Sequence, residues 1–289
     1  MAPVILDFSR FPAKQTLSLL DGMPSAPGLG IDGARCWYIR SMPLPLPFFP
    51  KIARVDTSSP DELARGWRHS YAGGRERRSF AFSFIRALER GGAFLVNPPV
   101  TFGQHFLKIE QLQLLRDVAV PVPRTLATND PAAVIDFARS IDGSVVYKPL
   151  AGGAPCRRVT PEDLHPERLS LLANAPVLFQ EEIPGRNLRV YAVAGRVVAS
   201  YEIVSAELDY RGAETAVLPV ALSDEEHKAS LRAAEACGLV FTGIDIRRRP
   251  DGTFALLECN PSPMFTAIER RTGEALVTRA LADLLYEHS

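Results

Sequence analysis

Three side chains with oxygen ligands lie close together in the last fifty residues of the chain. Asp245 belongs to an apolar stretch at residues 242–246, and Glu258 and Asn260 belong to a second one that begins at Leu257. Residues two apart in a strand point to the same face, and a hairpin about residues 249–252 brings Asp245 beside Glu258 and Asn260. Two carboxylates and an amide oxygen suit a hard cation such as Mg2+, which borrows further ligands from water and substrate phosphates. The spacing predicts a metal-dependent nucleotide site; the alternative is a turn-capping set.

A lysine at the end of another predicted strand can supply positive charge to the same nucleotide. Residues 145–149 read as a strand that carries Lys148 and is followed by a glycine pair at 152–153. An ammonium with flexible backbone beside it can contact a phosphate. The glycine loop alone is a nonspecific signal, and the alternative is a solvated surface lysine.

Helix and strand signals along the chain predict the scaffold that positions these residues. The proline-rich residues 41–50 predict a connector packed on the core, with a polyproline recognition segment as the alternative. Serine and proline predict a helix that starts at Ser59, and a separate helix covers residues 78–88 before glycines 91 and 92. Helices are also predicted at 108–117, 130–140, 223–238 and 272–286, strands at 93–96, 145–149 and 177–183, and a hairpin at 188–203. This mixture gives an α+β fold.

The composition excludes several function classes. The 289 residues can bury a large core in two or three lobes, and the 33 basic residues balance the 33 acidic ones. No global field therefore favours nucleic acid or a membrane surface, and no apolar run is long enough to span a bilayer. We expect a soluble cytoplasmic protein whose four scattered cysteines are free thiols, largely buried. The arginine run at residues 247–249 is interpreted as a solvated turn tip.

Several segments follow one another in an order that resembles the ATP-grasp superfamily. They are Lys108 in a helix, Lys148 before the glycine loop, and residues 180–183, 187–189, 209–211, 243–245 and 258–263. Their order is most similar to the RimK-like branch and, within it, to the graspetide (microviridin-type) peptide ester and amide ligases. The resemblance covers about residues 93–289 and implies two α/β lobes that clasp ATP, with a smaller N-terminal lobe. The implied boundaries are 1–100 for the N-terminal lobe, 101–182 for the central lobe and 183–289 for the C-terminal lobe with the metal site.

The resemblance implies a role for each of these residues. Lys108 and Lys148 would hold the ATP phosphates. Arg189 would steady an acyl phosphate and a tetrahedral intermediate, unless it forms an ion pair with a neighbouring strand. Arg211 would be a second arginine near the phosphates. The adenine hinge, the ribose contact and the metal ligands would complete the site, namely Gln180, Glu181, Glu182, Ile183, Asn187, Asp245, Glu258 and Asn260.

Some positions depart from the pattern of the similar ligases. Asn187 stands where relatives commonly have Asp, and Ala213 stands where they have Asn. Arg157 and Arg158 occupy the place of a longer glycine-rich clasp, where they either add charge or are simply exposed. The first ninety residues match poorly, so the resemblance does not extend to the part of the chain that often shares substrate recognition.

The resemblance implies an ATP- and Mg2+-dependent ligase, with Mn2+ as an alternative ion. A carboxylate, on a peptide or protein substrate, would be activated as an acyl phosphate and captured by an amine or hydroxyl. Two alternatives stay open on the same scaffold: a nucleotide-responsive binding module without turnover, favoured by the departures at Asn187 and Ala213, and a small-molecule kinase. Nucleic acid and membrane are not expected partners, and a homodimer is left open.

Overall fold

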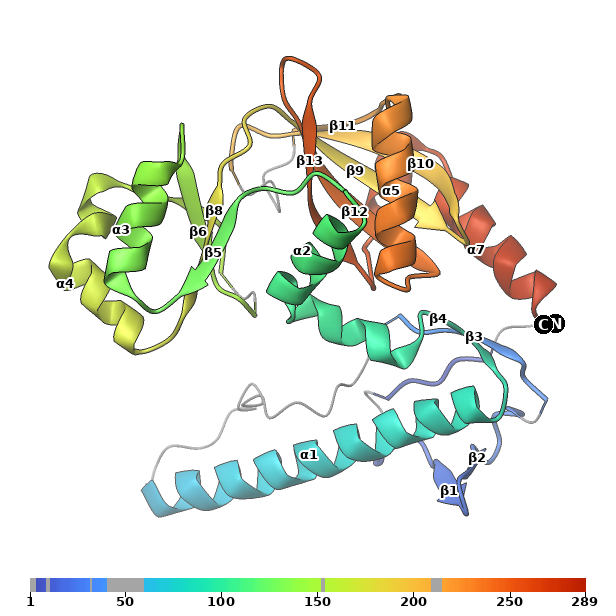
Figure 1. The fold of residues 1–289 in the computed structure, drawn as a ribbon. Helices are drawn as coiled ribbons and strands as arrows, with labels where there is room; N and C mark the ends of the chain where they lie inside the picture. The colour runs from blue at the N-terminus through green and yellow to red at the C-terminus, as the bar shows by residue number, and fades with distance from the viewer. Residues whose placement is uncertain (1–3, 9–10, 32, 41–59, 152–153, 209–214) are drawn as a thin grey trace. The chain divides into compact units, whose positions relative to one another are not determined.

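A computed structural model describes residues 4–8, 11–31, 33–40, 60–151, 154–208 and 215–289, with side chains in the first long helix described from residue 72 onward (Figure 1). The chain forms two compact units, Met1–Phe102 with Leu285–Ser289, and Gly103–Leu284. The predicted proline-rich connector at 41–50, the glycine pair at 152–153, Ala213 and Arg211 lie outside the described residues.

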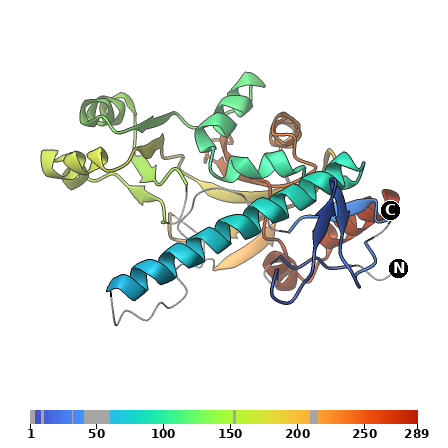
Figure 2. The same cartoon turned by 90° about the horizontal axis from the view of Figure 1, so that it is seen from below.

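The first unit is built around one long helix, α1 (Pro60–Arg90), which runs without interruption (Figure 2). The prediction of two separate helices here is wrong. Gly73 and Gly74 cost roughly 1 kcal/mol each in a helix interior, but strong helix formers surround them. The apolar side of the helix further stabilises it, since Phe84 is fully buried and Phe80 stacks on Phe11. The predicted end at the glycine pair is confirmed, because Gly92 adopts a φ of 88° just beyond the helix.

Short strands complete this first unit. The hairpin β1 (Ser18–Leu20) and β2 (Met23–Ser25) is antiparallel, whereas β3 (Cys36–Tyr38) pairs in parallel with β4 (Phe94–Val96). The last residues of the chain pack on these strands, because Cys36 Sγ donates to the Leu285 carbonyl at 3.0 Å and His288 stacks on Phe94. A 3-10 helix, η1 (Pro99–His105), follows β4.

The second unit contains two antiparallel sheets. The central sheet has the order β5 (Thr125–Thr128), β8 (Val177–Glu181), β6 (Val145–Lys148) and β7 (Arg157–Arg158). Its core includes Phe179 from the sheet and Val134 from α3 (Pro131–Ser140), a helix that Asp130 caps by accepting from the Ala132 N–H. The short η2 (Pro161–Leu164), α4 (Pro166–Leu169) and η3 (Ser170–Ala173) follow β7, and Leu169 joins the same core.

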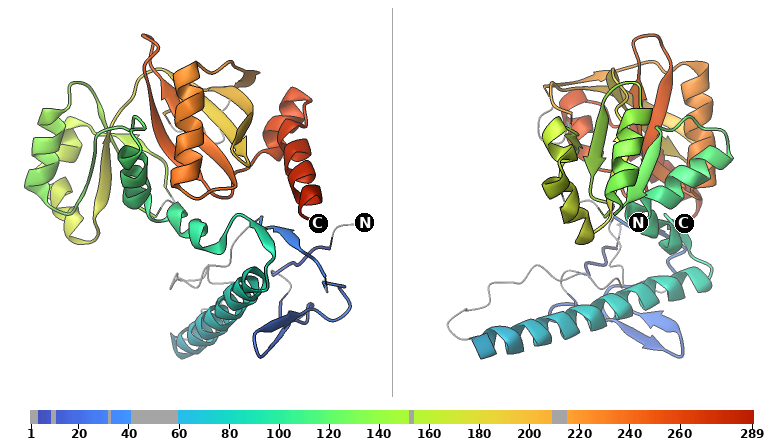
Figure 3. Two further views of the ribbon diagram at one scale, coloured as in Figure 1. Left: turned by 45° about the vertical axis from the view of Figure 1, so that its right-hand side comes forward. Right: turned by 60° about the vertical axis from the view of Figure 1, so that its left-hand side comes forward.

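The C-terminal sheet has the order β11 (Ala216–Pro219), β10 (Arg196–Val204), β9 (Arg186–Val193), β12 (Phe241–Arg248) and β13 (Phe254–Asn260). One face packs on α5 (Asp224–Ala236), which Figure 3 shows lying along the sheet. This face also packs on α2 (Lys108–Asp117). Alternate residues such as Val190, Ile244 and Leu256 fill that core. The intervening residues of β9 and β12 therefore face the other side, where the chemistry lies.

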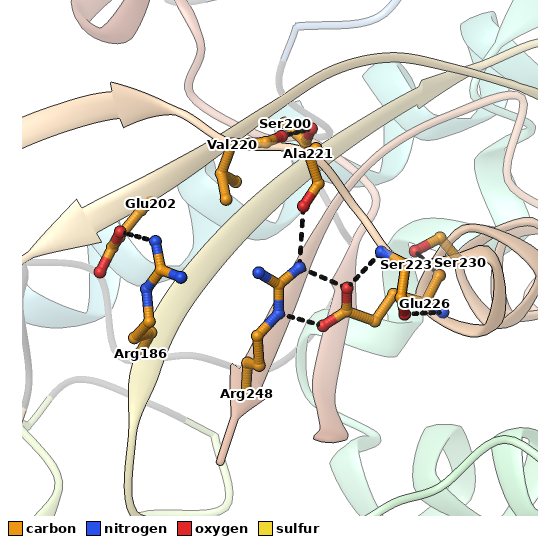
Figure 4. A network of polar contacts seen from close by, with 9 residues as sticks. All are labelled: Arg186, Ser200, Glu202, Val220, Ala221, Ser223, Glu226, Ser230 and Arg248. Carbon is orange, nitrogen blue, oxygen red and sulfur yellow. Dashed lines mark hydrogen bonds and ion pairs between the residues drawn. The ribbon is translucent and has the colours of Figure 1, made fainter. Parts of the chain in front are cut away.

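Helix α5 is anchored by a buried charge. Glu226 and Ser223 form the predicted capping box, with Ser223 N donating to Glu226 Oε2 at 2.8 Å. Glu226 is fully buried, and Arg248 Nε donates to its other oxygen at 2.7 Å (Figure 4). Burial alone would raise the pKa of Glu226, but Arg248 and the Ser223 cap outweigh it and hold the pKa below its ordinary value. The carboxylate thus stays ionised inside the fold.

The last helix, predicted over residues 272–286, is present but begins later than predicted, and a further helix precedes it. The structure has two helices, α6 (Thr266–Thr272) and α7 (Leu276–Glu287). Gly273 adopts a left-handed φ of 73° and ends α6, so the expected start of a helix is in fact a helix end. The hairpin around Ala194 and Gly195 and the helix at 223–238 are confirmed by β9, β10 and α5.

Candidate active site

The three predicted metal ligands lie on one face of the C-terminal sheet. Asp245 pairs directly with Glu258 across β12 and β13, and Gly243 pairs with Asn260. The alternation turns Cys259 into the core and leaves Glu258 and Asn260 lining a cavity. The register shifts beside Asp245, where Leu257 is the extra residue of a β-bulge. Bulges commonly re-aim side chains next to active sites, and this one lies next to the two carboxylates.

The donor set is chemically suited to a hard cation. Asn260 Oδ1 accepts a hydrogen bond from the Ser262 N–H at 2.8 Å, so the amide also caps the turn after β13. A carbonyl oxygen has a second lone pair and can still bind a ligand. Among the residues that the structure describes, no group of three His, Cys, Asp or Glu side chains gathers as a metal cluster. Two carboxylates and one amide suit an ion that keeps several waters, as Mg2+ does.

Basic side chains surround these carboxylates. Lys108 Nζ lies 3.3 Å from Glu258 Oε2, and Arg189 Nε lies 3.2 Å from Asp245 Oδ1, its neighbour across β9 and β12. Burial would raise the pKa of Glu258, but Lys108, Lys148 and Arg189 together lower it below its ordinary value. Glu258 is therefore an anion at neutral pH. The predicted alternative for Arg189, an ion pair with a neighbouring strand, is present in the structure.

Lys148 occupies the central sheet on the other wall. Its Nζ lies 3.3 Å from Gln180 Oε1, and Gln180 in turn donates to Thr125 Oγ1 at 3.0 Å. Burial and the nearby Lys108 lower the pKa of Lys148, while Glu258 partly offsets them. Lys148 is thus a partly buried cation close to a second one, a setting in which an anionic ligand would be stabilised.

The predicted adenine hinge covers the last two residues of β8 and the two residues after it, and it is held by backbone and side-chain hydrogen bonds. Glu181 N donates to the Arg124 carbonyl at 2.9 Å, and Glu182 N donates to the Ser144 carbonyl at 2.8 Å. The Glu182 carboxylate receives Nε and Nη2 of Arg158 at 2.8 and 2.7 Å. Arg158 is 60% exposed yet paired, so it adds charge at the edge of the hinge.

The arginine run at 247–249 is not the solvated tip that was predicted. Arg247 Nε donates to the Ile183 carbonyl at 2.8 Å, and Arg247 also bonds Asn187 Oδ1. Arg248 bonds Glu226, and Arg249 Nη2 donates to Glu181 Oε1 at 2.9 Å. The prediction is wrong because β12 continues to Arg248, so these long side chains alternate across the sheet and reach partners on both sides.

One cavity of about 480 Å³ lies between the two sheets of the second unit. Every predicted site residue in the described part of the chain lines it, namely Lys108, Lys148, Gln180, Glu181, Glu182, Ile183, Asn187, Arg189, Asp245, Glu258 and Asn260. Apolar side chains that sequence reasoning did not single out also line it, among them Val146, Ile203, Val217, Leu257 and Met264. For Val146 the signal was the alternation in β6, which carries Lys148, whereas Ile203 and Val217 lie in strands that carry no predicted site residue.

Sequence reasoning assigned no role to two residues that hold the predicted metal end in place, that is, the end of the cavity with Asp245, Glu258 and Asn260. Gln111 is buried, and its amide binds Cys259 with both atoms: Nε2 donates to the Cys259 carbonyl at 2.7 Å, and the Cys259 N–H donates to Oε1 at 2.9 Å. Gly243 has no room for a side chain, since a Cβ there would stand 2.6 Å from Pro263 Cβ and 2.9 Å from Arg189 Nη1. Both residues lie within or beside the segments that carry the resemblance, but nothing in the sequence indicated the contacts that they make.

Comparisons with known proteins give the family. The RimK-like ATP-grasp domain matches residues 107–284. A probable alpha-L-glutamate ligase of Teredinibacter turnerae is 32% identical over 207 residues, covering 68% of this chain and 68% of that protein. The chain belongs to the RimK-like ATP-grasp family.

Solved structures extend the likeness to the whole chain. The ATP-grasp ligase PsnB, complexed with a minimal precursor, superposes with a TM-score of 0.85 at 34% identity, covering 100% of this chain and 91% of that chain. The macrocyclase MdnC from Microcystis aeruginosa MRC, bound with the precursor peptide MdnA, gives a TM-score of 0.78 at 23% identity, covering 98% and 89%, and so shares the fold.

These findings confirm the predicted α+β ATP-grasp fold and the RimK-like branch. The chain is an ATP-grasp ligase that joins a carboxylate to an amine, and ligases of this class use ATP. Within the described residues, no helix is both long and apolar enough to cross a membrane.

Proposed function

We propose that the protein is an ATP- and Mg2+-dependent ligase that modifies a peptide or protein. A carboxylate of the substrate attacks the γ-phosphorus of ATP, the bond from that phosphorus to ADP breaks, and an acyl phosphate forms. An amine or hydroxyl then attacks the acyl carbon, phosphate leaves with the former acyl oxygen, and the nucleophile loses its proton. The observation that carries the proposal is the single cavity that unites the two carboxylates, the basic side chains and the hinge.

The extent of the likeness supports a peptide or protein substrate. The glutamate ligase of Teredinibacter turnerae covers 68% of this chain, whereas PsnB, a ligase complexed with a precursor, covers all of it at 34% identity. The N-terminal unit is therefore shared with a peptide-bound ligase. We propose that this unit contributes to peptide recognition and that the reaction joins side chains of such a peptide.

Basic side chains would bind the phosphates and the developing charge. Lys148 and Lys108 lie on opposite walls of the cavity, one on the central sheet and one on the helix that packs on the C-terminal sheet. Arg189 lies beside Asp245, where its guanidinium can reach charge that appears on the acyl group in the transition state. Arg211 is proposed for the same end of the site by resemblance alone.

Asp245, Glu258 and Asn260 would hold Mg2+, or Mn2+ in its place. The ion, when bound, would neutralise phosphate charge and orient the γ-phosphate. The chain's own contribution is the cross-strand pairing that sets the two carboxylates opposite each other and the ionised state of Glu258.

The nucleoside would lie at the other end of the cavity. Val146, Ile203 and Leu257 offer apolar surface for a base, and the hinge residues Gln180, Glu181, Glu182 and Ile183 border it. Asn187 would contact the ribose, although Arg247 already bonds its amide oxygen. Since the reaction consumes ATP, we propose that the protein works in the cytoplasm. A homodimer stays a prediction. The expectation that neither nucleic acid nor a membrane is a partner also stays a prediction.

The proposal is tested by incubating the protein with ATP, Mg2+ and peptides that combine Glu or Asp with Lys, Ser or Thr. We expect a peptide that loses the mass of one water per bond formed, with one ADP and one phosphate released. Gain of a phosphate mass on the product would instead indicate a kinase. ATP binding without ADP release on any peptide of the panel would indicate a binding module, and failure to bind ATP with Mg2+ would refute the proposal.

A further inference from the structure

A second, smaller cavity adjoins the nucleotide cavity at its metal end. It has a volume of about 300 Å³ and shares Lys108, Glu258 and Asn260 with the larger one. Its remaining lining contains none of the hinge residues and comes from Gln104, His105, Phe106, Gln111, Ala151 and Cys259. The Lys108–Glu258 pair is therefore the wall common to both spaces. A group in the smaller cavity would meet the phosphate end of a nucleotide rather than its base.

The amides in this lining are already engaged. Gln111 binds the Cys259 backbone and donates to Gln104 Oε1 at 3.0 Å, while Gln104 Nε2 donates to the Cys237 carbonyl at 2.8 Å. These bonds make one side of the cavity rigid. They also leave the amides little capacity to recognise a ligand.

His105 and Lys108 are different. Within the described part of the chain, the imidazole of His105 makes no hydrogen bond, and this half-buried ring lies edge-on to Phe106 with 6.2 Å between centroids. The ammonium of Lys108 has three N–H donors, and its bond to Glu258 uses one of them. An imidazole N–H, an ammonium and an aromatic face thus stand together around a space that opens toward the phosphate site.

Carboxylate is the ligand chemistry that matches this set. An ionised acceptor gains charge-assisted hydrogen bonds from an ammonium and an imidazole, and the short aliphatic stem of an acidic side chain can pack on a phenyl ring. We propose that the smaller cavity binds the side-chain carboxylate of the substrate, with Lys108 and His105 donating to its oxygens and Phe106 covering its methylene groups. This inference rests on the proposed function, because it places the carboxylate beside the γ-phosphate that it attacks.

The test uses a probe that carries only the relevant group. N-acetyl-L-glutamate α-amide is a glutamate residue with both peptide ends blocked, and N-acetyl-L-glutamine amide is its uncharged match. With a non-hydrolysable ATP analogue and Mg2+ bound to the full chain, calorimetry should show the acid binding about tenfold or more tightly than the amide, as expected for a hydrogen-bonded charge. A crystal of that complex should place the acid against His105 and Phe106.

Substitutions then separate this inference from the proposed function. His105→Ala should weaken binding of the acid about tenfold while the affinity for the ATP analogue changes less than about twofold. His227→Ala, at an exposed histidine on α5, should change neither. Equal affinity for acid and amide, an acid seated elsewhere, or unchanged acid binding in His105→Ala would overturn the inference while the proposed function stands. A wild-type protein that does not bind the ATP analogue would instead refute the proposed function.

Discussion

The two ends of the nucleotide cavity use similar pairs of basic and acidic side chains in different ways. At the metal end, Lys108 and Arg189 lie beside Glu258 and Asp245, and all four side chains line the cavity. At the hinge end, Arg158 forms an ion pair with Glu182, and Arg249 forms one with Glu181. Neither arginine lines the cavity, so these pairs hold the hinge in position.

The comparison teaches that an ion pair indicates a role in the reaction only when both of its side chains line the cavity. Of the two hinge arginines, neither lines the cavity, whereas both glutamates do. Changes at the metal end should therefore reduce turnover and leave the fold intact. Changes at the hinge end should alter nucleotide affinity by small factors.

The largest effect is expected from Glu258→Gln. The substitution removes a carboxylate that would hold the metal and leaves Lys108 without its anionic partner. We expect the rate of ADP release to fall by roughly two to three orders of magnitude, as for loss of one preorganised electrostatic group. The melting temperature should stay close to that of the wild type. Glu225→Gln, at a 69% exposed site on α5, is the matched control. A fully active Glu258→Gln protein would overturn the assignment of the metal end.

A buried pair outside the cavity sharpens the comparison, because it should affect stability alone. Arg248→Met leaves the fully buried Glu226 without its guanidinium, which should lower the free energy of unfolding by about 3 to 5 kcal/mol. Arg186→Met is the control, since Arg186 is 49% exposed beside Glu202 and its loss should cost less than about 1 kcal/mol. Urea unfolding followed by circular dichroism measures both. Equal losses would show that burial does not distinguish the two pairs in Figure 4.

Gly243→Ala should disturb the metal end without removing any charged group. The new methyl group would overlap Pro263 Cβ and press on Arg189 Nη1. We expect an overpacking cost of about 1 to 3 kcal/mol and about a tenfold lower kcat, because Arg189 must move away from Asp245. At Gly103, an added Cβ would meet Leu107 Cδ1 at an ordinary 3.8 Å, so Gly103→Ala serves as the control. Wild-type kcat in Gly243→Ala would show that the position of Arg189 is unimportant.

The smallest effect is expected at the hinge, from Arg158→Gln. Arg158 lowers the pKa of Glu182 below its ordinary value of 4.5, so their pairing stabilises the fold above that pH and is lost as pH falls through the folded pKa. The difference in melting temperature between wild type and variant should be small at pH 7 and should shrink further below about pH 4.5. The KM for ATP should rise a few-fold at most, while Arg157→Gln, at an exposed neighbour, leaves it unchanged. A large loss of kcat would place the hinge pair in the chemistry.

The placement of the three predicted metal ligands side by side could be predicted because their geometry is local. Strand alternation and one short turn suffice to bring Asp245, Glu258 and Asn260 together, and a hairpin of this length leaves little freedom. The hairpin about Ala194 and the capping box at Ser223 were predictable for the same reason. Each depends on residues within a few positions of one another.

The failures at the arginine run, at α1 and at Gln111 involve contacts between distant parts of the chain or a balance of small terms. The partners of these three arginines come from the hinge, β9 and α5, which no local pattern reveals. The continuous helix α1 depends on packing that outweighs the cost of Gly73 and Gly74. Gln111 could be recognised only when α2 was seen beside β13, 148 positions later in the sequence.

Helix α2 carries both Lys108 and Gln111, one turn apart, and Gln111 grips the backbone of β13 between Glu258 and Asn260. These two hydrogen bonds fix the register of β13 against α2. A slip of one residue would turn the side chains that line the cavity into the core. The positions of Lys108 and Glu258 are therefore fixed relative to each other through α2 and β13. Lys148 lies in the other sheet, so a change in the separation of the two sheets would alter the Lys148–Glu258 distance and leave the Lys108–Glu258 distance unchanged. The distance from Lys148 to Glu258 is thus the one that would report the separation of the two sheets.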